Sequence, residues 1–239
     1  MRQGISLQDW LHTPRAQLAM RWEKAVLSRL WPRFYGHSAL AIGSWGEHLP
    51  VFPPRWRVEV VGHEPGLHCG ALSDLWELPL MDSSADLAIL RHSLAFARSP
   101  HRLLRETDRI LSQRGQLLIL NFSPFSSWGL GSKLPLRAMQ LPHNMRLLSA
   151  NRLIDWLHLL DFRVEDMGHY GPRTPLWAER LGVNRLIQPG YFILARKQRL
   201  PVRPLQQGWR QAQPLWGGQV AMGRSRSSAR VIPFPQRNA

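Results

Sequence analysis

The residues best suited to chemistry follow short apolar runs that are typical of buried strands. Gly43 and Gly46 come after the run Ser38–Ile42, and Glu64 comes after the run Arg57–Val61. Glycines allow a ligand to approach the backbone closely, and a carboxylate just past a second strand can accept hydrogen bonds from ribose hydroxyls. The spacing therefore indicates a nucleotide-type ligand. An ordinary turn with two glycines and an exposed loop glutamate would give the same pattern.

Arg91 and His92 follow a third apolar run, Leu87–Leu90. An imidazole titrates near neutral pH, so His92 can act as a general base or as a hydrogen-bond donor to a substrate. It can equally form part of the wall of a ligand site. Cys69 is the single cysteine, which excludes an intrachain disulfide and a zinc site built on thiolates.

The stretch Asp86–Leu130 contains the elements that must position these residues. Leu87–Leu90 predicts a buried strand, Ser99-Pro100 predicts the start of a helix, and Gln116–Leu120 predicts a second strand. Parallel strands need a crossover, and crossovers are nearly always right-handed helices, so this βαβ unit predicts a parallel sheet covered by helices. In open sheets of this kind ligands bind at the carboxyl ends of the strands. The aromatic loop Phe122–Trp128 follows the second strand, as a ligand wall or as the anchor of a flap.

Other parts of the chain complete a doubly wound α/β pattern. Ser6 with Asp9, and Thr13 with Pro14, predict helix starts within residues 7–30. A stripe of Leu18, Trp22, Val26 and Leu30 predicts the buried face, although a membrane-surface helix has a similar pattern. A further helix is expected from Ser149 or Ala150, and late strands at Phe162–Met167 and Tyr191–Ala195. The chain after Gly66 looks irregular up to Asp74.

Net charge divides the chain into a body and a tail. Of the formal net charge of +15, residues 197–239 carry +8, with eight Lys or Arg and no Asp or Glu. This tail is predicted to be disordered, as an arm for nucleic acid, anionic lipid or an acidic partner, or as a solvated extension. We expect an N-terminal helical extension at 1–37 and one α/β domain at 38–196. The N-terminus lacks the pattern of a signal peptide, and no run of about 18 apolar residues is present, so a soluble cytoplasmic protein is expected.

Several motifs together resemble a known family. They are Asp74-x-x-x-Leu-Pro, Asp86-Leu-Ala-Ile-Leu-x-His-x-Leu, Leu103-Leu-Arg-Glu-x-Asp-Arg-Ile-Leu, Gly115-Gln-Leu-Leu-Ile and Ser126-Ser-Trp-Gly. In this order the chain resembles the class I S-adenosylmethionine-dependent methyltransferases of the type 11 group. It is most similar to a bacterial branch with a Ser-x-Trp-Gly loop after the fifth strand. The resemblance covers residues 38–196 and implies a Rossmann-like, mostly parallel seven-stranded sheet, with S-adenosylmethionine as cofactor.

The resemblance also implies roles for individual residues. The turn of Gly43, Trp45 and Gly46 would lie under the methionine part of the cofactor, and Glu64, or His63 in its place, would face the ribose hydroxyls. Asp74 and Leu75 match the loop that meets adenine. Arg91 and His92 match the position where the reactive methyl group is exposed, and His92 is the catalytic candidate.

The glycine turn also departs from the family's pattern. Ala41 stands where the family has an acid, Trp45 stands at a glycine position, and Ala95 replaces an acid of the branch. Two hypotheses of different classes follow. The chain is a methyltransferase of unknown substrate, or it is a catalytically degenerate methyltransferase-fold protein that binds partners, for instance through its tail. An unrelated nucleotide-sugar or NAD enzyme is disfavoured because the glycine fingerprint and its long helix are missing.

Overall fold

The computed structural model describes residues 5–43, 56–62, 71–72, 78–132, 141–142, 145–172, 180–181, 183 and 187–198. The helices of this part are α1 (Leu7–Leu11), α2 (Pro14–Leu30), the 3-10 turn η1 (Trp31–Arg33), α3 (Ser93–Phe96), α4 (Pro100–Ile110), α5 (Ser127–Gly131) and α6 (Ala150–Leu159). The strands are β1 (Ser38–Gly43), β2 (Arg57–Gly62), β3 (Ala71–Leu72), β4 (Ala85–Arg91), β5 (Leu111–Phe122), β6 (Phe162–Tyr170) and β7 (Gly190–Lys197).

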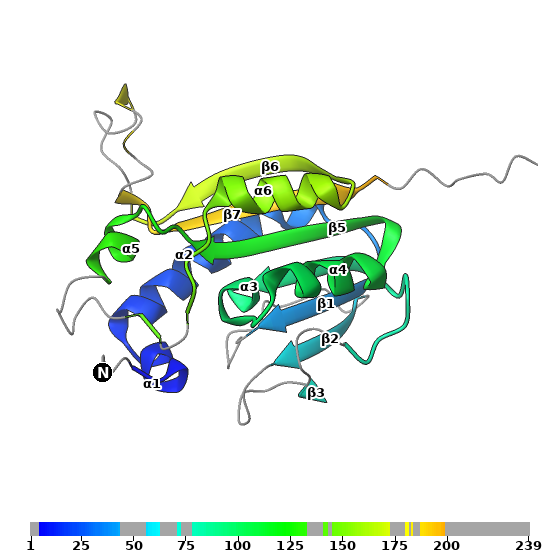
Figure 1. Cartoon of the computed structure of the whole chain (residues 1–239), viewed down its shortest axis with the longest axis horizontal. Helices are drawn as coiled ribbons and strands as arrows, with labels where there is room; N and C mark the ends of the chain where they lie inside the picture. Colours follow the sequence, from blue (N-terminus) through cyan, green and yellow to red (C-terminus); the bar gives the residue numbers. More distant parts are fainter. Residues whose placement is uncertain are drawn as a thin grey trace, which may run out of the picture. The chain divides into compact units, whose positions relative to one another are not determined.

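The strands of the described residues form one mixed sheet in the order β3-β2-β1-β4-β5-β7-β6 (Figure 1). Neighbours from β3 to β5 are parallel, whereas β7 lies antiparallel between β5 and β6. The predicted Rossmann-like α/β fold is therefore confirmed. The short strand β3 corrects the expectation of irregular chain after Gly66. With two residues, paired to Val61 and Gly62, it is too short to give an apolar pattern in the sequence.

The βαβ unit predicted around α4 is present. The strands β4 and β5 are parallel neighbours, and α4 begins at Pro100, directly after its N-cap Ser99. Proline suits the first turn of a helix because the amide hydrogen it lacks would have no partner there. The observed β5 begins at Leu111, five residues before the predicted start, so strand and helix follow one another without a separate loop.

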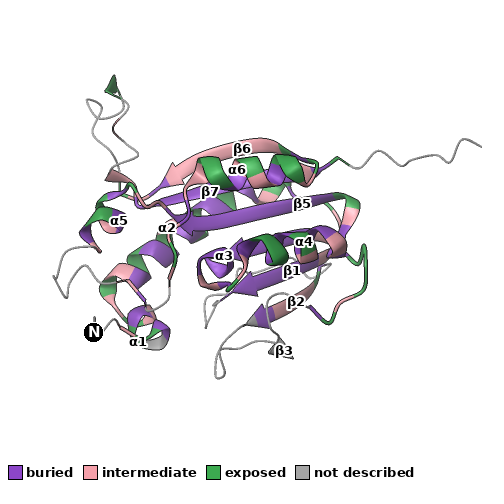
Figure 2. Ribbon diagram, viewed as in Figure 1, coloured by how far each residue is buried: buried purple, intermediate pink, exposed green. Residues whose placement is uncertain are grey.

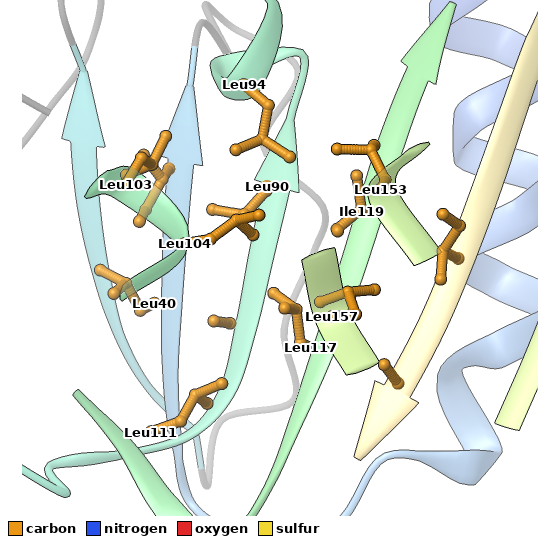
Figure 3. Packing of buried hydrophobic residues seen from close by; sticks show 14 of the residues in the cluster. Leu40, Leu90, Leu94, Leu103, Leu104, Leu111, Leu117, Ile119, Leu153 and Leu157 are labelled. Atoms are coloured by element: carbon orange, nitrogen blue, oxygen red, sulfur yellow. The ribbon is translucent and has the colours of Figure 1, made fainter. Parts of the chain in front are cut away.

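One face of the sheet is covered by α4 and α6. Figure 3 shows their leucines, Leu103 and Leu104 on one helix and Leu153 and Leu157 on the other, directed at side chains of β1, β4 and β5. These four leucines are at most 1% exposed. Burying a leucine side chain contributes about 1.5–3 kcal/mol, so this layer stabilises the unit that carries the strand ends.

The opposite face is covered by α1 and α2, and here the predicted buried stripe is only partly right. The caps Ser6 and Thr13 form as predicted, each accepting a backbone amide hydrogen bond. Leu18, however, is 42% exposed. Steps of four residues drift about 40° per step around a helix, so the stripe leaves the sheet at its N-terminal end. The buried face of α2, visible in Figure 2, is made by Ala16, Ala19, Met20, Glu23, Val26, Leu27 and Leu30.

The chain divides into two compact units, Met1–Val202 and Arg203–Ala239. The helices α1 and α2 belong to the first unit with the sheet.

The strand β7 runs to Lys197, which the sequence assigned to the tail. The ammonium group of Lys197 is buried and lies 3.0 Å from Asp108 Oδ1. Residues 199–239 lie outside the described residues, so the predicted disorder of the tail stays a prediction. None of the helices in the described ranges is long and apolar enough to cross a membrane.

Candidate functional site

Gly43 and Arg91 lie side by side where β1 and β4 end. They are partners in the parallel register, and Gly43 has φ of +129°, which L side chains rarely adopt. A Cβ atom at Gly43 would lie 2.2 Å from the Arg91 carbonyl oxygen. The close approach of the two strand ends is therefore enough to require glycine here, whether or not a ligand also approaches it.

His92 follows in a left-handed conformation, with φ of 54°. Its backbone N–H donates to the Leu120 carbonyl at 2.9 Å, and its ring stacks on Phe122 with 4.3 Å between ring centres. Such a conformation costs a non-glycine residue free energy of order 1–3 kcal/mol, and it persists where the surroundings hold it. His92 therefore sits in a defined orientation at the carboxyl edge of the sheet.

Glu23 of α2 binds both residues. Its carboxylate accepts a hydrogen bond from Arg91 Nε at 2.6 Å, and its other oxygen lies 2.8 Å from His92 Nε2. Glu23 is 2% exposed and His92 8% exposed. Burial alone would raise the pKa of Glu23, but the charges and hydrogen bonds of Arg91 and His92 lower it to about 2. Glu23 is thus a carboxylate at neutral pH.

Tyr170, at the end of β6, completes the cluster. Its hydroxyl donates to Glu23 Oε1 at 3.2 Å and lies 3.5 Å from the Asn121 carbonyl oxygen. Burial and the Glu23 charge raise the pKa of Tyr170 well above its usual value, so the phenol remains protonated and acts as a donor. Groups from the ends of β4 and β6 therefore meet on one carboxylate of α2.

His92 is one of the residues that line a small cavity. Glu23 is ionised and can only accept, so a neutral His92 ring would carry its proton on Nε2 and have an acceptor at Nδ1. Within the described part of the chain, His92 Nδ1 and Ser93 Oγ are buried without a hydrogen-bond partner. The cavity is lined by His92 together with Leu7, Trp10, Leu11, Ala19, Glu23, Arg91, Phe96 and Met145. A buried acceptor without a partner at a strand end fits a ligand that donates a proton or a hydrogen bond.

The structure brings Gly43, Arg91 and His92 together, three of the residues that the sequence singled out. The other predicted cofactor residues, Trp45, Gly46, Glu64 (with its alternative His63), Asp74 and Leu75, lie outside the described residues. The groups of the described part include no cluster of three or more His, Cys, Asp or Glu that could hold a metal ion.

The aromatic loop after β5 packs against α2. Ser126 caps α5, and Trp128 lies 5.8 Å from Trp22 and 5.5 Å from Phe122, measured between ring centres. The Arg15 guanidinium lies 5.4 Å from the Trp128 ring centre. Of the two predicted roles, ligand wall or anchor, these contacts correspond to an anchor that ties the loop to the N-terminal helix.

Sequence reasoning missed Glu23 and Tyr170. A signal for Glu23 existed, because a carboxylate within the apolar face of a helix is rarely buried without a partner. The predicted stripe of Leu18, Trp22, Val26 and Leu30 did not include Glu23. Tyr170 carried no local signal, since its partner lies 147 positions away in the chain.

The fold is similar to that of solved proteins named as SAM-dependent methyltransferases. A SAM-dependent methyltransferase from Thermotoga maritima superposes with a TM-score of 0.54 and 17% identity, covering 80% of this chain and 94% of that one. A SAM-dependent methyltransferase from Archaeoglobus fulgidus gives a TM-score of 0.54 and 17% identity, covering 73% of this chain and 93% of that one. The [4+2]-cyclase SpnF gives a TM-score of 0.51 and 19% identity, covering 81% of this chain and 86% of that one. At these identities the similarity shows the fold alone.

Sequence comparison adds a match to a domain model and a match to a curated relative. Residues 58–119 match a methyltransferase domain of the type 11 group. The uncharacterized protein YafS of Escherichia coli (strain K12) is 32% identical over 155 residues, which is 65% of this chain and 65% of that protein. The chain thus matches a little under two thirds of its curated relative. The chain thus resembles the class I S-adenosylmethionine-dependent methyltransferases in its fold, and its residues 58–119 match a methyltransferase domain of the type 11 group.

Proposed function

We propose that this protein is an S-adenosylmethionine-dependent methyltransferase acting on an acceptor still to be identified. The observation that carries the proposal is the type 11 match over residues 58–119. That segment runs from β2 to β5, and at its strand ends the described residues leave His92 Nδ1 and Ser93 Oγ buried without partners. The fold by itself would not be sufficient to propose methyl transfer, since it is shared with a protein named as a cyclase.

By likeness to the family, Gly43, Trp45, Gly46, Glu64, Asp74 and Leu75 would hold the cofactor, and Arg91 and His92 would lie beside its reactive group. S-adenosylmethionine, when bound, supplies a methyl group on a sulfonium, whose sulfur keeps the electron pair of the carbon–sulfur bond when an acceptor takes the methyl. For such an in-line displacement the protein needs mainly to position the reactants and, for a protonated acceptor, to supply one base.

Thermal unfolding with and without S-adenosylmethionine or S-adenosylhomocysteine tests the proposal. A ligand at 100 times its dissociation constant stabilises the fold by about 2.7 kcal/mol, which is visible as a higher melting temperature. Glu64→Gln should weaken this stabilisation, because it removes the charge expected at the ribose. The matched control Glu59→Gln, within β2, should leave it unchanged. If neither ligand raises the melting temperature, the proposal of a methyltransferase is rejected.

A second candidate function rests on the charge of the tail. A catalytically degenerate methyltransferase-fold protein could bind nucleic acid or an acidic partner through residues 197–239, which carry +8 without a single acid. Counterion release makes such binding fall steeply with salt. The test compares the full chain with a full-length variant in which six tail arginines are replaced by glutamine, over a salt series. Equal binding by the two proteins would contradict a role of the tail in binding nucleic acid or an acidic partner. The six are Arg203, Arg210, Arg224, Arg226, Arg230 and Arg237.

A further inference from the structure

The helices α4 and α6 carry a group of arginines on the side that faces away from the sheet. Both helices cover the same face of the sheet, and Figure 2 shows the exposed side of each in green. Five arginines of these helices and of the segments just before them are exposed, and no lysine is found among them. We call this surface the arginine face. It consists of Arg98, Arg102, Arg105, Arg146 and Arg152.

Contacts between side chains join the two helices at the arginine face. The His101 ring lies 3.7 Å from the Trp156 ring, measured between ring centres, and the Arg152 guanidinium lies 5.3 Å from the centre of the same indole ring. Arg105 follows His101 by one helical turn, so both side chains lie on one side of α4. The arginines of α4 and α6 therefore flank the line along which the two helices meet.

The segment before α6 adds a further arginine at the start of α4. The Arg146 backbone N–H donates to the Ala95 carbonyl at 2.8 Å, and Arg146 Nη1 donates to the Arg98 carbonyl at 3.4 Å. Arg98 and Arg146 thus lie beside each other, although 48 positions separate them in the chain. The arginine face is one surface made by two parts of the chain that fold together.

The acids of α4 and α6 leave most of this positive charge uncompensated. Glu106 is bound by Arg109, with 2.8 Å between Nη2 and Oε2, and Asp108 is buried beside Lys197. In these two helices, both of which lie within the described residues, Asp155 is the one exposed acid. The arginine face therefore has a net positive charge that ion pairs within the two helices do not neutralise.

The composition of the arginine face fits the phosphate backbone of a nucleic acid. A guanidinium donates paired hydrogen bonds to a phosphate group and also stacks on planar rings, as Arg152 does on Trp156. A lipid surface or a protein partner would instead need exposed apolar side chains at the centre of the contact. The exposed side chains of α4 are all polar: His101, Arg102 and Arg105.

We propose that the arginine face binds the phosphate backbone of a nucleic acid, and that Arg102 and Arg105 each contact a phosphate group. Contacts to phosphates position a nucleic acid without reading its sequence, so unrelated base sequences should bind equally well. The arginine face belongs to the folded domain and is separate in the chain from the tail at 197–239. Its binding needs no cofactor, so the proposal does not rest on methyl transfer.

Fluorescence anisotropy of labelled single-stranded oligonucleotides measures the salt dependence of binding by the full chain. Each phosphate contact to a single strand contributes roughly 0.7 to the slope of log K against log salt concentration. Arg102→Gln combined with Arg105→Gln should therefore lower the slope by about 1.4, equally for unrelated base sequences. The matched control, Arg21→Gln combined with Lys24→Gln, removes two exposed charges from α2 on the opposite face of the sheet and should keep the slope.

The tail variant, in which six tail arginines are replaced by glutamine, separates the arginine face from the tail. This full-length variant should still bind the oligonucleotides. Arg102→Gln combined with Arg105→Gln should again lower the slope by about 1.4 in this background. Loss of all binding in the tail variant would assign the binding to the tail and overturn the proposal.

Other results would also overturn the proposal. They are an absence of binding by the full chain, a slope that Arg102→Gln with Arg105→Gln leaves unchanged, and an equal loss of slope in the α2 control. Vesicles that contain phosphatidylserine test for a lipid surface. If Arg102→Gln with Arg105→Gln weakens binding to these vesicles but not to nucleic acid, the proposal is wrong. The melting temperature with S-adenosylhomocysteine tests the methyltransferase proposal separately from all of these results.

Discussion

Replacing Glu23 by glutamine should destabilise the protein strongly, because the buried guanidinium of Arg91 would lose the carboxylate that its Nε binds. Removing one member of a buried ion pair costs about 3–5 kcal/mol. The pKa of Glu23 gives a similar free energy, because a carboxyl whose pKa falls from 4.5 to about 2 on folding contributes roughly 3 kcal/mol to the free energy of unfolding at neutral pH. Urea unfolding of wild type and Glu23→Gln at neutral pH measures the difference.

The pH dependence of that difference has a defined sign. The folded-state pKa of Glu23 is depressed, so its contribution is fully present above the ordinary value of 4.5 and is lost as the pH falls through about 2. The stabilities of wild type and Glu23→Gln should therefore approach each other between these two pH values. Glu59→Gln, on β2, is the matched control and should change stability by less than about 0.5 kcal/mol. A loss below about 1 kcal/mol for Glu23→Gln, or a difference that stays constant down to pH 2, would refute the reasoning.

Two further predictions concern Gly43 and Lys197. Gly43→Ala places a Cβ 2.2 Å from the Arg91 carbonyl at φ of +129°, so urea unfolding should show a loss above the roughly 1–3 kcal/mol of backbone strain alone. Gly115→Ala, whose nearest neighbour is the flexible Leu111 side chain, should lose less, and equal losses would contradict the close approach. Lys197→Met removes the ammonium group that lies 3.0 Å from the buried Asp108 carboxylate and should cost about 3–5 kcal/mol by the same assay. The exposed Lys24→Met should be neutral, and an equally neutral Lys197→Met would show that Lys197 belongs to the tail as the sequence suggested.

The local patterns of the sequence were sufficient for most of the fold. Apolar runs such as Leu87–Leu90 predicted strands, and Ser99-Pro100 predicted the start of α4, because these signals arise from neighbouring residues. The two-residue strand β3 escaped, since so short a segment has no period. The buried face of α2 was misplaced because the stripe through Leu18 ignored the drift of four-residue steps.

The site was predictable only in part, for a physical reason. Arg91 and His92 could be located because they follow the apolar run Leu87–Leu90. Their partner Glu23 lies 68 and 69 positions earlier in the chain, and only the packing of α2 on the sheet brings it to them. Gly43 shows the converse, since the sequence assigned it to a ligand and the structure shows that the Arg91 carbonyl already requires a glycine.

Binding of the cofactor at the carboxyl edge of β1 and β4 is tested most directly by a titration of S-adenosylhomocysteine, followed through the amide NMR resonances of Gly43 and His92. Saturable shifts of these two resonances, with the amides of Leu103 and Leu157 on the far face unchanged, are expected. Resonances of Gly43 and His92 that stay in place up to a large excess of the ligand would contradict a methyltransferase site at this edge.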